Sequence, residues 1–164
     1  MENSQSLPEL IVAAQADAKI FEDRIGAAQN GTEAQTADLR AATAALELAA
    51  VDAFTLFEAR MQHHFKRGPF SRKLKAALLD AKHPDLADRI HKHYLAVNVL
   101  KHGTGASYRE LLAAKVTPFT VIPVADVVVD ENRKTSGLID VSTPGFFDGL
   151  ANALLEAYAF LEGR

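Results

Sequence analysis

The chain has 164 residues, of which 48% are hydrophobic and 24% charged, with a formal net charge of -3. This balance is that of a soluble globular protein, and the apolar runs fall short of the ~20 residues that a membrane-spanning helix needs. The sequence contains no cysteine, which excludes disulfides, thiolate nucleophiles and cysteine-ligated zinc. We expect a single domain over 1–164 and, since no secretory leader is present, a cytoplasmic location.

Positive charge is concentrated in the middle of the chain. Residues 60–109 contain eleven of the 18 Lys and Arg residues, three of the 21 acids and all six histidines. This segment therefore carries a charge of +8, and the remainder of the chain carries -11. The separation indicates an anionic partner for the basic segment, or contact between oppositely charged halves of one or two chains. A basic face that is only solvated is the alternative interpretation.

Apolar spacing predicts two long helices in the first part of the chain. Over 7–25, apolar residues recur at intervals of four and three, which is typical of a helix that lays one narrow stripe along a partner helix. Asn30-Gly31 ends this helix. A capping box of Thr32 and Gln35 opens the second helix, which runs to about residue 65. Its two apolar stripes and many alanines predict a central helix that is contacted closely on two sides.

A short basic helix is predicted after the break at Gly68-Pro69, where proline makes continuation of the second helix costly. It covers 71–82. Leu74, Leu78 and Leu79 are expected to face the core, while the basic side chains face solvent.

The next helix is predicted to begin at Pro84, because the first helical residue needs no amide donor. It reaches Lys101 or His102, and Gly103 is expected to close it in a left-handed conformation. Ser107 and Glu110 have the spacing of a second capping box, which would open a short helix to about residue 115.

The character of the sequence changes over 116–143, where β-branched residues predominate. Two such runs separated by a polar stretch indicate a small two-stranded hairpin or an ordered extended excursion. Pro118 and Pro123 argue against a central strand. Ser142 or Thr143 is expected to cap the final helix.

We therefore predict an all-α fold, a four- to six-helix up-and-down bundle with a small β-hairpin or extended insertion before the C-terminal helix. The final helix should bury one apolar stripe, formed by Phe147, Leu150, Ala151, Leu154, Tyr158 and Leu161.

One face of the predicted helix at 84–102 carries a polar row. His91, Asn98 and His102 recur at i, i+7 and i+11, so two imidazoles and an amide share this face beside an apolar stripe. Asn98 and His102 could equally cap or hydrogen-bond the end of their own helix. For His91 and His93, solvated helix positions are the favoured interpretation.

The stretch HYLAVNVLKHG at 93–103 resembles the signature helix end of HEPN-domain proteins, which carry an Arg-polar pair, a short spacer and His, often followed by Gly. Asn98 matches the polar residue, and His102 with Gly103 matches the terminal pair. Val97 stands at the arginine position. The resemblance covers about a dozen residues and implies a helical bundle, commonly a homodimer, that acts as a metal-independent ribonuclease or as an inactive partner or scaffold.

The resemblance makes His102 the catalytic candidate, with Asn98 as its orienting neighbour. An imidazole that titrates near neutrality can transfer the protons of RNA cleavage, and the missing guanidinium would have stabilised the transition-state charge. Four further residues are candidates for substrate binding, and some of them for replacing that charge: Lys101, Arg89, Lys92 and His91.

Three functions remain open from the sequence. The first is an active or degenerate ribonuclease, with a toxin–antitoxin or defence role and a cognate partner protein as options. The second is a non-catalytic module whose basic segment binds RNA, a nucleotide or an acidic protein. The third is a structural protein that self-assembles through its oppositely charged halves. Neighbouring histidines on a helix diverge by about 100°, so we expect no metal site and no cofactor.

Overall fold

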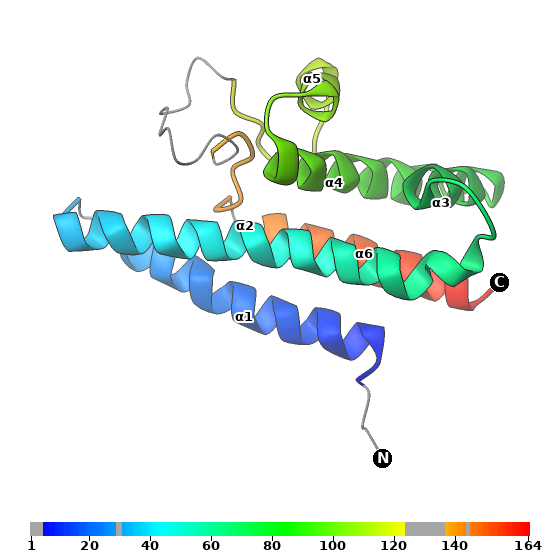
Figure 1. Ribbon diagram of the computed structural model, residues 1–164, viewed down its shortest axis with the longest axis horizontal. Helices are drawn as coiled ribbons and strands as arrows, with labels where there is room; N and C mark the ends of the chain where they lie inside the picture. Colours follow the sequence, from blue (N-terminus) through cyan, green and yellow to red (C-terminus); the bar gives the residue numbers. More distant parts are fainter. Residues whose placement is uncertain (1–4, 29–30, 124–136, 144) are drawn as a thin grey trace.

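Four long helices form the body of the computed structural model, which describes residues 5–28, 31–123, 137–143 and 145–164. The long helices are α1 (Leu7–Ala27), α2 (Glu33–Met61), α4 (Pro84–His102) and α6 (Phe146–Glu162). Two shorter helices, α3 (Phe70–Asp80) and α5 (Ala106–Ala113), pack against α4, and a 3-10 turn, η1 (Gln62–His64), ends α2. Figure 1 shows α1 running antiparallel to α2 with α4 on the other side of α2. The predicted all-α bundle is confirmed.

The first two helices begin where side chains satisfy their unpaired amides. The Ser6 hydroxyl accepts a hydrogen bond from the Glu9 amide over 3.3 Å, at the start of α1. The Thr32 hydroxyl accepts from the Gln35 amide over 3.2 Å, and the Gln35 side-chain oxygen accepts from the Thr32 amide over 3.3 Å. This reciprocal pair is the predicted capping box, and each such cap contributes about 1 kcal/mol.

The central position predicted for α2 is also confirmed, because this helix contacts α1, α4 and α6. It buries small and aromatic residues on different sides. The ring centroids of Phe54 and Phe57 lie 6.1 Å apart, and Phe57 meets Phe70 of α3 edge to face at 5.6 Å. These aromatic contacts fix the C-terminal half of α2 against the helices that carry the basic segment.

The short basic helix buries two of the three leucines that were predicted to face the core. Phe70, Leu74 and Leu78 are buried at intervals of four, whereas Leu79 is 48% exposed. One residue turns an α-helix by about 100°, so Leu79 points away from the stripe that Leu78 completes. The inward position predicted for Leu79 is wrong.

Pro84 begins α4 as predicted, and Gly103 follows its last residue. Gly103 has φ +77° and ψ -140°. The positive φ expected there is confirmed, but the ψ value lies outside the left-handed helical region that a standard helix cap adopts. The chain turns sharply here, and α5, seen end-on in Figure 1, crosses the end of α4.

The described part of the insertion contains one antiparallel bridge, between Val121 and Ile139, and no strand. The Ile122 amide donates to the Leu138 carbonyl over 2.9 Å, and the Asp140 amide donates to the Thr120 carbonyl over 3.0 Å. The described residues therefore show a bridge between two extended segments, and a two-stranded hairpin is not shown among them. Most of the predicted polar turn lies outside the described residues.

The start of α6 differs from the prediction. Gly145, with φ +90°, occupies the N-cap position, and no side chain caps the helix there. The Ser142 hydroxyl instead bonds the Asp140 carboxylate over 2.5 Å. The cap predicted at Ser142 or Thr143 is wrong because the helix begins later, at Phe146. None of the described helices is both long and apolar enough to cross a membrane.

Candidate functional site

Two side-chain pairs join the polar row of α4 to α5. The Asn98 side-chain amide donates to the Ser107 hydroxyl over 3.3 Å, and the His91 Nε2 lies 2.5 Å from a Glu110 carboxylate oxygen. The capping box predicted for Ser107 and Glu110 is wrong, because α5 begins after Gly105 without a side-chain cap. Their side chains reach back to α4 instead of capping α5. The two polar pairs therefore serve to hold α5 across the end of α4.

His102, the catalytic candidate, is the last residue of α4 and is exposed, as is Lys101. Within the described part of the chain, the His102 side chain has no hydrogen-bond or ion-pair partner. Asn98 bonds Ser107 and not His102. The structure thus places the two motif residues on one helix end without the contact that an orienting residue makes with a catalytic base.

Val97, at the arginine position of the motif, is 2% exposed and belongs to the hydrophobic core. It lies five positions before His102, which is about 140° around a helix, so the two side chains leave α4 in very different directions. An arginine at position 97 would point into the bundle. The departure from the motif is therefore matched by the packing around this position.

Three of the four predicted substrate-binding residues hold carboxylates of the same chain. Arg89 contacts Asp85 at 3.0 Å and Glu156 at 2.6 Å, and Lys92 contacts Asp88 at 2.8 Å. The hydrogen bond to Glu156 is the main reason that the pKa of Arg89 is raised.

The third of these residues, His91, forms an ion pair with Glu110 when it is protonated. The fourth predicted residue, Lys101, lies close enough to Glu58 to oppose the upward shift that burial causes in the pKa of that carboxyl. Much of the positive charge of α4 is therefore compensated inside the molecule.

The residues around α3 differ, because their positive charge is not compensated by ion pairs among the described residues. We call this set the α3 basic surface, and it consists of Lys66, Arg67, Arg72, Lys73, Lys75 and Lys82. All six are exposed except the half-buried Lys75, and Asp80 is the one acid on α3. A surface of this kind attracts a polyanion.

Lys82 has the one positive φ, +64°, among the described residues other than glycine. The Lys82 amide donates to the Leu79 carbonyl over 3.0 Å, and the His83 amide donates to the Leu78 carbonyl over 2.8 Å. This is the closing turn that usually contains glycine, because a side chain is strained there. Lysine therefore adopts a conformation here that costs it more free energy than it would cost glycine.

Two hollows border the α3 basic surface, and Phe160 of α6 lines both. The first, of about 530 Å³, is lined by Lys73, Ala76, Ala77, Asp80, Ala81, Phe160 and Arg164. The second, of about 600 Å³, is lined by Lys82, His83, Pro84, Asp85, Leu86, Arg89, Glu156, Ala159 and Phe160. Arg164 places its guanidinium 5.9 Å from the Phe160 ring centroid, and the His83 ring meets Phe160 edge to face at 5.5 Å. The partly exposed ring of Phe160 therefore lies between two hollows whose linings combine basic side chains with the carboxylates of Asp80, Asp85 and Glu156.

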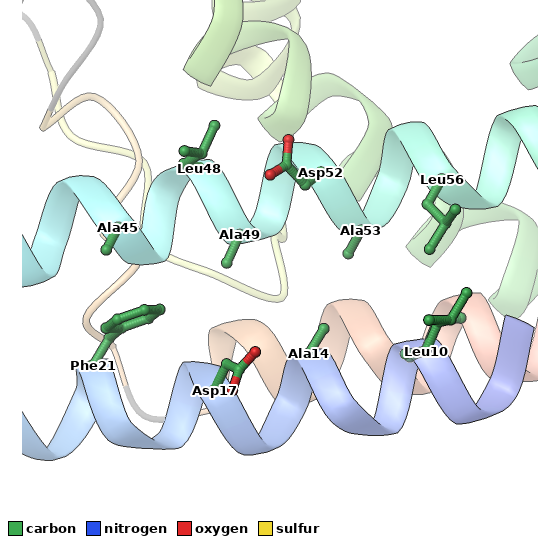
Figure 2. Close-up of a pocket in the computed structure, with 11 residues that line it drawn as sticks. Leu10, Ala14, Asp17, Phe21, Ala45, Leu48, Ala49, Asp52, Ala53 and Leu56 are labelled. Carbon is green, nitrogen blue, oxygen red and sulfur yellow. The ribbon is translucent and has the colours of Figure 1, made fainter. Parts of the chain in front are cut away.

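A third hollow, of about 370 Å³, lies between α1 and α2 and is mostly apolar. Figure 2 shows Ala45, Ala49 and Ala53 on the face of α2 that is turned toward α1. Two carboxylates, those of Asp17 and Asp52, line it, and no basic residue does. This groove, which we call the α1–α2 groove, suits an apolar or basic partner and not a polyanion.

His93 was expected to be solvated and is buried instead, with 2% of its surface exposed. Its Nδ1 donates to the Arg89 carbonyl over 2.8 Å, and its ring lies 5.3 Å from Phe119 and 6.3 Å from Phe146. Burial lowers its pKa, so His93 is neutral at pH 7. The sequence could not reveal this, because Phe119 and Phe146 lie on distant parts of the chain.

Sequence reasoning also missed Phe160, His83 and Arg164 as members of one site. The available signal was that Phe160 is aromatic but is not part of the predicted apolar stripe of α6, which includes Tyr158 and Leu161.

No known family model matches this chain, and neither the curated proteins nor the solved structures with which it was compared include a significant match.

Proposed function

We propose that this protein is a degenerate HEPN-like module that binds single-stranded RNA through the α3 basic surface without cleaving it. The observation that carries the proposal is the contrast between α3 and α4. The cations of α4 at Arg89 and Lys92 are held by carboxylates, whereas the six cations of the α3 basic surface have no ion-pair partner among the described residues. Phosphates of a nucleic acid would supply the missing negative charge.

The aromatic ring of Phe160 supports single-stranded RNA as the anion. Base stacking on an aromatic side chain contributes about 1–3 kcal/mol per base and needs an unpaired base. Phe160 is half-buried between two hollows that also contain Lys73, Lys82 and Arg164. A stacking ring within a basic surface is typical of sequence-tolerant binding of single strands. The proposal implies a cytoplasmic location, because single-stranded RNA is available there.

Two features favour binding over catalysis. Val97 is buried at the motif arginine position, and His102 has no orienting contact among the described residues. Removal of one donor that stabilises the transition-state charge typically lowers the rate by about 10² to 10³. Metal-independent cleavage by His102, with Asn98 as its neighbour, is the alternative that the experiment below distinguishes.

The test measures the affinity for a labelled, mixed-sequence single-stranded RNA by fluorescence anisotropy at two salt concentrations. We expect salt-sensitive binding, because each phosphate contact contributes about 0.7 to the slope of log K against log salt. Arg72→Glu with Lys73→Glu should abolish binding. The control is Lys115→Glu, which reverses the charge of an exposed lysine outside the α3 basic surface. Its affinity for the RNA should fall by no more than the loss of one phosphate contact.

A second variant tests the aromatic ring. Phe160→Leu keeps an apolar side chain in contact with the core but removes the stacking surface, so affinity should fall roughly tenfold. Cleavage is followed in parallel in EDTA for the wild type and His102→Ala. Cleavage that disappears with His102 would make the protein a nuclease, and equal affinity in the wild type and the α3 double variant would refute the proposal.

Self-association is a second candidate function, favoured by the α1–α2 groove. Its mostly apolar lining includes Asp17 and Asp52, and Leu48, which also lines it, is 60% exposed. A second copy could therefore be held by apolar contact and by attraction between this face and a basic surface. Sedimentation of the wild type and of Leu48→Glu at two salt concentrations tests it. A wild type that stays monomeric at low salt excludes a homodimer.

A further inference from the structure

Three side chains with metal-binding atoms meet where α2 and α6 end. They are His63 and His64 of η1 and Glu162, the last residue of α6. The His64 Nε2 lies 3.1 Å from a Glu162 carboxylate oxygen, and the ring centroids of His63 and His64 lie 4.3 Å apart. One ligand atom of each residue lies within 4.8 Å of those of the other two. The cluster thus offers two imidazole nitrogens and a carboxylate.

The three residues come from two elements that lie far apart in the sequence. The chain leaves the α-helix at Met61 and enters a 3-10 turn, whose geometry differs from that of the helix before it. The third ligand comes from a residue 98 positions away. Figure 1 shows the ends of α2, in green, and of α6, in red, on the same side of the bundle. Packing of α6 beside α2 therefore supplies the third ligand, and the two neighbouring rings meet although a 3-10 turn rotates successive residues by about 120°.

We propose that His63, His64 and Glu162 bind a divalent transition-metal ion of the zinc class, at a site separate from the α3 basic surface. Zinc binds His nitrogen at about 2.0–2.1 Å and carboxylate oxygen at about 2.0–2.2 Å, so donors around one ion lie roughly 3.3 Å apart. The His64–Glu162 pair already has that spacing. His63 is exposed, and its ligand atom lies within 4.8 Å of those of His64 and Glu162.

The surroundings agree with this donor set. Glu162 is 46% exposed and His64 18% exposed, so water can complete a four-coordinate site. Among the described residues, no lysine or arginine forms an ion pair with Glu162. Arg164, two residues later, lies instead over the rings of Phe65 and Phe160. The ion would tie η1 to the last turn of α6 and thereby stabilise the folded chain.

The experiment is a calorimetric titration of the untagged protein with zinc chloride, with the imidazole resonances of His63 and His64 followed by NMR. We expect one ion per chain, a higher midpoint of thermal unfolding in zinc, and no comparable binding of magnesium, which prefers oxygen ligands. His63→Gln, which removes an exposed ring that forms no hydrogen bond with any described residue, and Glu162→Gln should each weaken zinc binding about tenfold or more.

The matched control is His91→Gln, because His91 and Glu110 form a His–Glu pair for which the described residues provide no third ligand. This variant should bind zinc as the wild type does. Circular dichroism confirms that each variant is folded. The proposal is overturned if zinc binding is absent in the wild type, if it survives both His63→Gln and Glu162→Gln, or if His91→Gln weakens it equally.

Discussion

The amide of the Asn98 side chain donates to the Ser107 hydroxyl over 3.3 Å and joins the end of α4 to the first turn of α5. Both side chains are half-buried, so each would otherwise lose part of its hydration without a partner. The polar residue that resembles a catalytic motif thus has a structural bond in this fold. Loss of this hydrogen bond should lower the free energy of unfolding, whether or not it changes an activity.

We expect Asn98→Ala and Ser107→Ala each to lower the free energy of unfolding by about 1 kcal/mol, which is the typical value for one such hydrogen bond. A double-mutant cycle should give a coupling of about 0.5–1 kcal/mol, measured by urea denaturation. Asn152→Ala, at an exposed asparagine of α6, is the control and should change little. Simple additivity of the two changes would show that the bond contributes nothing.

An arginine at position 97, as in the motif that the sequence resembles, should destabilise the fold. Val97 is 2% exposed in the core, so Val97→Arg would bury a guanidinium without a partner, and we expect a loss of about 3–5 kcal/mol or no folded protein. Val12→Arg makes the same change at a position of α1 that is 55% exposed, and it should alter stability by less than about 0.5 kcal/mol. Thermal unfolding compares the two. A Val97→Arg variant as stable as Val12→Arg would contradict the packing described for α4.

Stability should decrease in mild acid because of His93. Burial lowers the pKa of His93 in the folded protein below its unfolded value of about 6.5. As the pH falls from about 6.5 toward the folded pKa, the unfolded chain takes up a proton that the folded chain does not, and stability falls by up to about 1.4 kcal/mol per pH unit. Above about pH 6.5 this contribution is constant.

His93→Gln isolates this effect, because glutamine keeps a donor for the Arg89 carbonyl but does not titrate. The difference in unfolding free energy between wild type and variant, measured by urea denaturation, should shrink as the pH falls below 6.5. A difference that stays constant over this range would mean that His93 takes up its proton alike in the folded and the unfolded chain.

Lys82 should show a conflict between stability and binding. Its φ of +64° strains a lysine side chain, so Lys82→Gly should raise the free energy of unfolding by about 1 kcal/mol. The same change removes a cation from the α3 basic surface and should weaken the RNA binding that we propose. Asparagine tolerates this conformation better than lysine does, so Lys82→Asn should also raise the free energy of unfolding and weaken the proposed binding. A glycine variant that binds RNA as tightly as the wild type would remove Lys82 from the proposed site.

Most of the helix boundaries follow from short-range signals that the sequence carries by itself. The Thr32–Gln35 capping box, the break at Gly68-Pro69 and the proline at the first position of α4 act through the backbone groups nearest to them, so local chemistry is sufficient to predict them. The apolar stripes also predicted the central place of α2. The bundle is therefore largely determined by periodicity and by residues that start or stop a helix.

The roles of polar side chains were decided by tertiary contacts. Ser107 and Glu110 have the spacing of a cap, but residues of α4 lie within their reach and take their hydrogen bonds. His93 is neutral because two phenylalanines from distant segments cover it.

His64 meets Glu162 because α2 and α6 end on the same side of the bundle. Hydrophobic periodicity specifies which face of a helix is buried, whereas the partner of a polar side chain depends on which helix is packed beside it. That second kind of information arises only when the helices assemble.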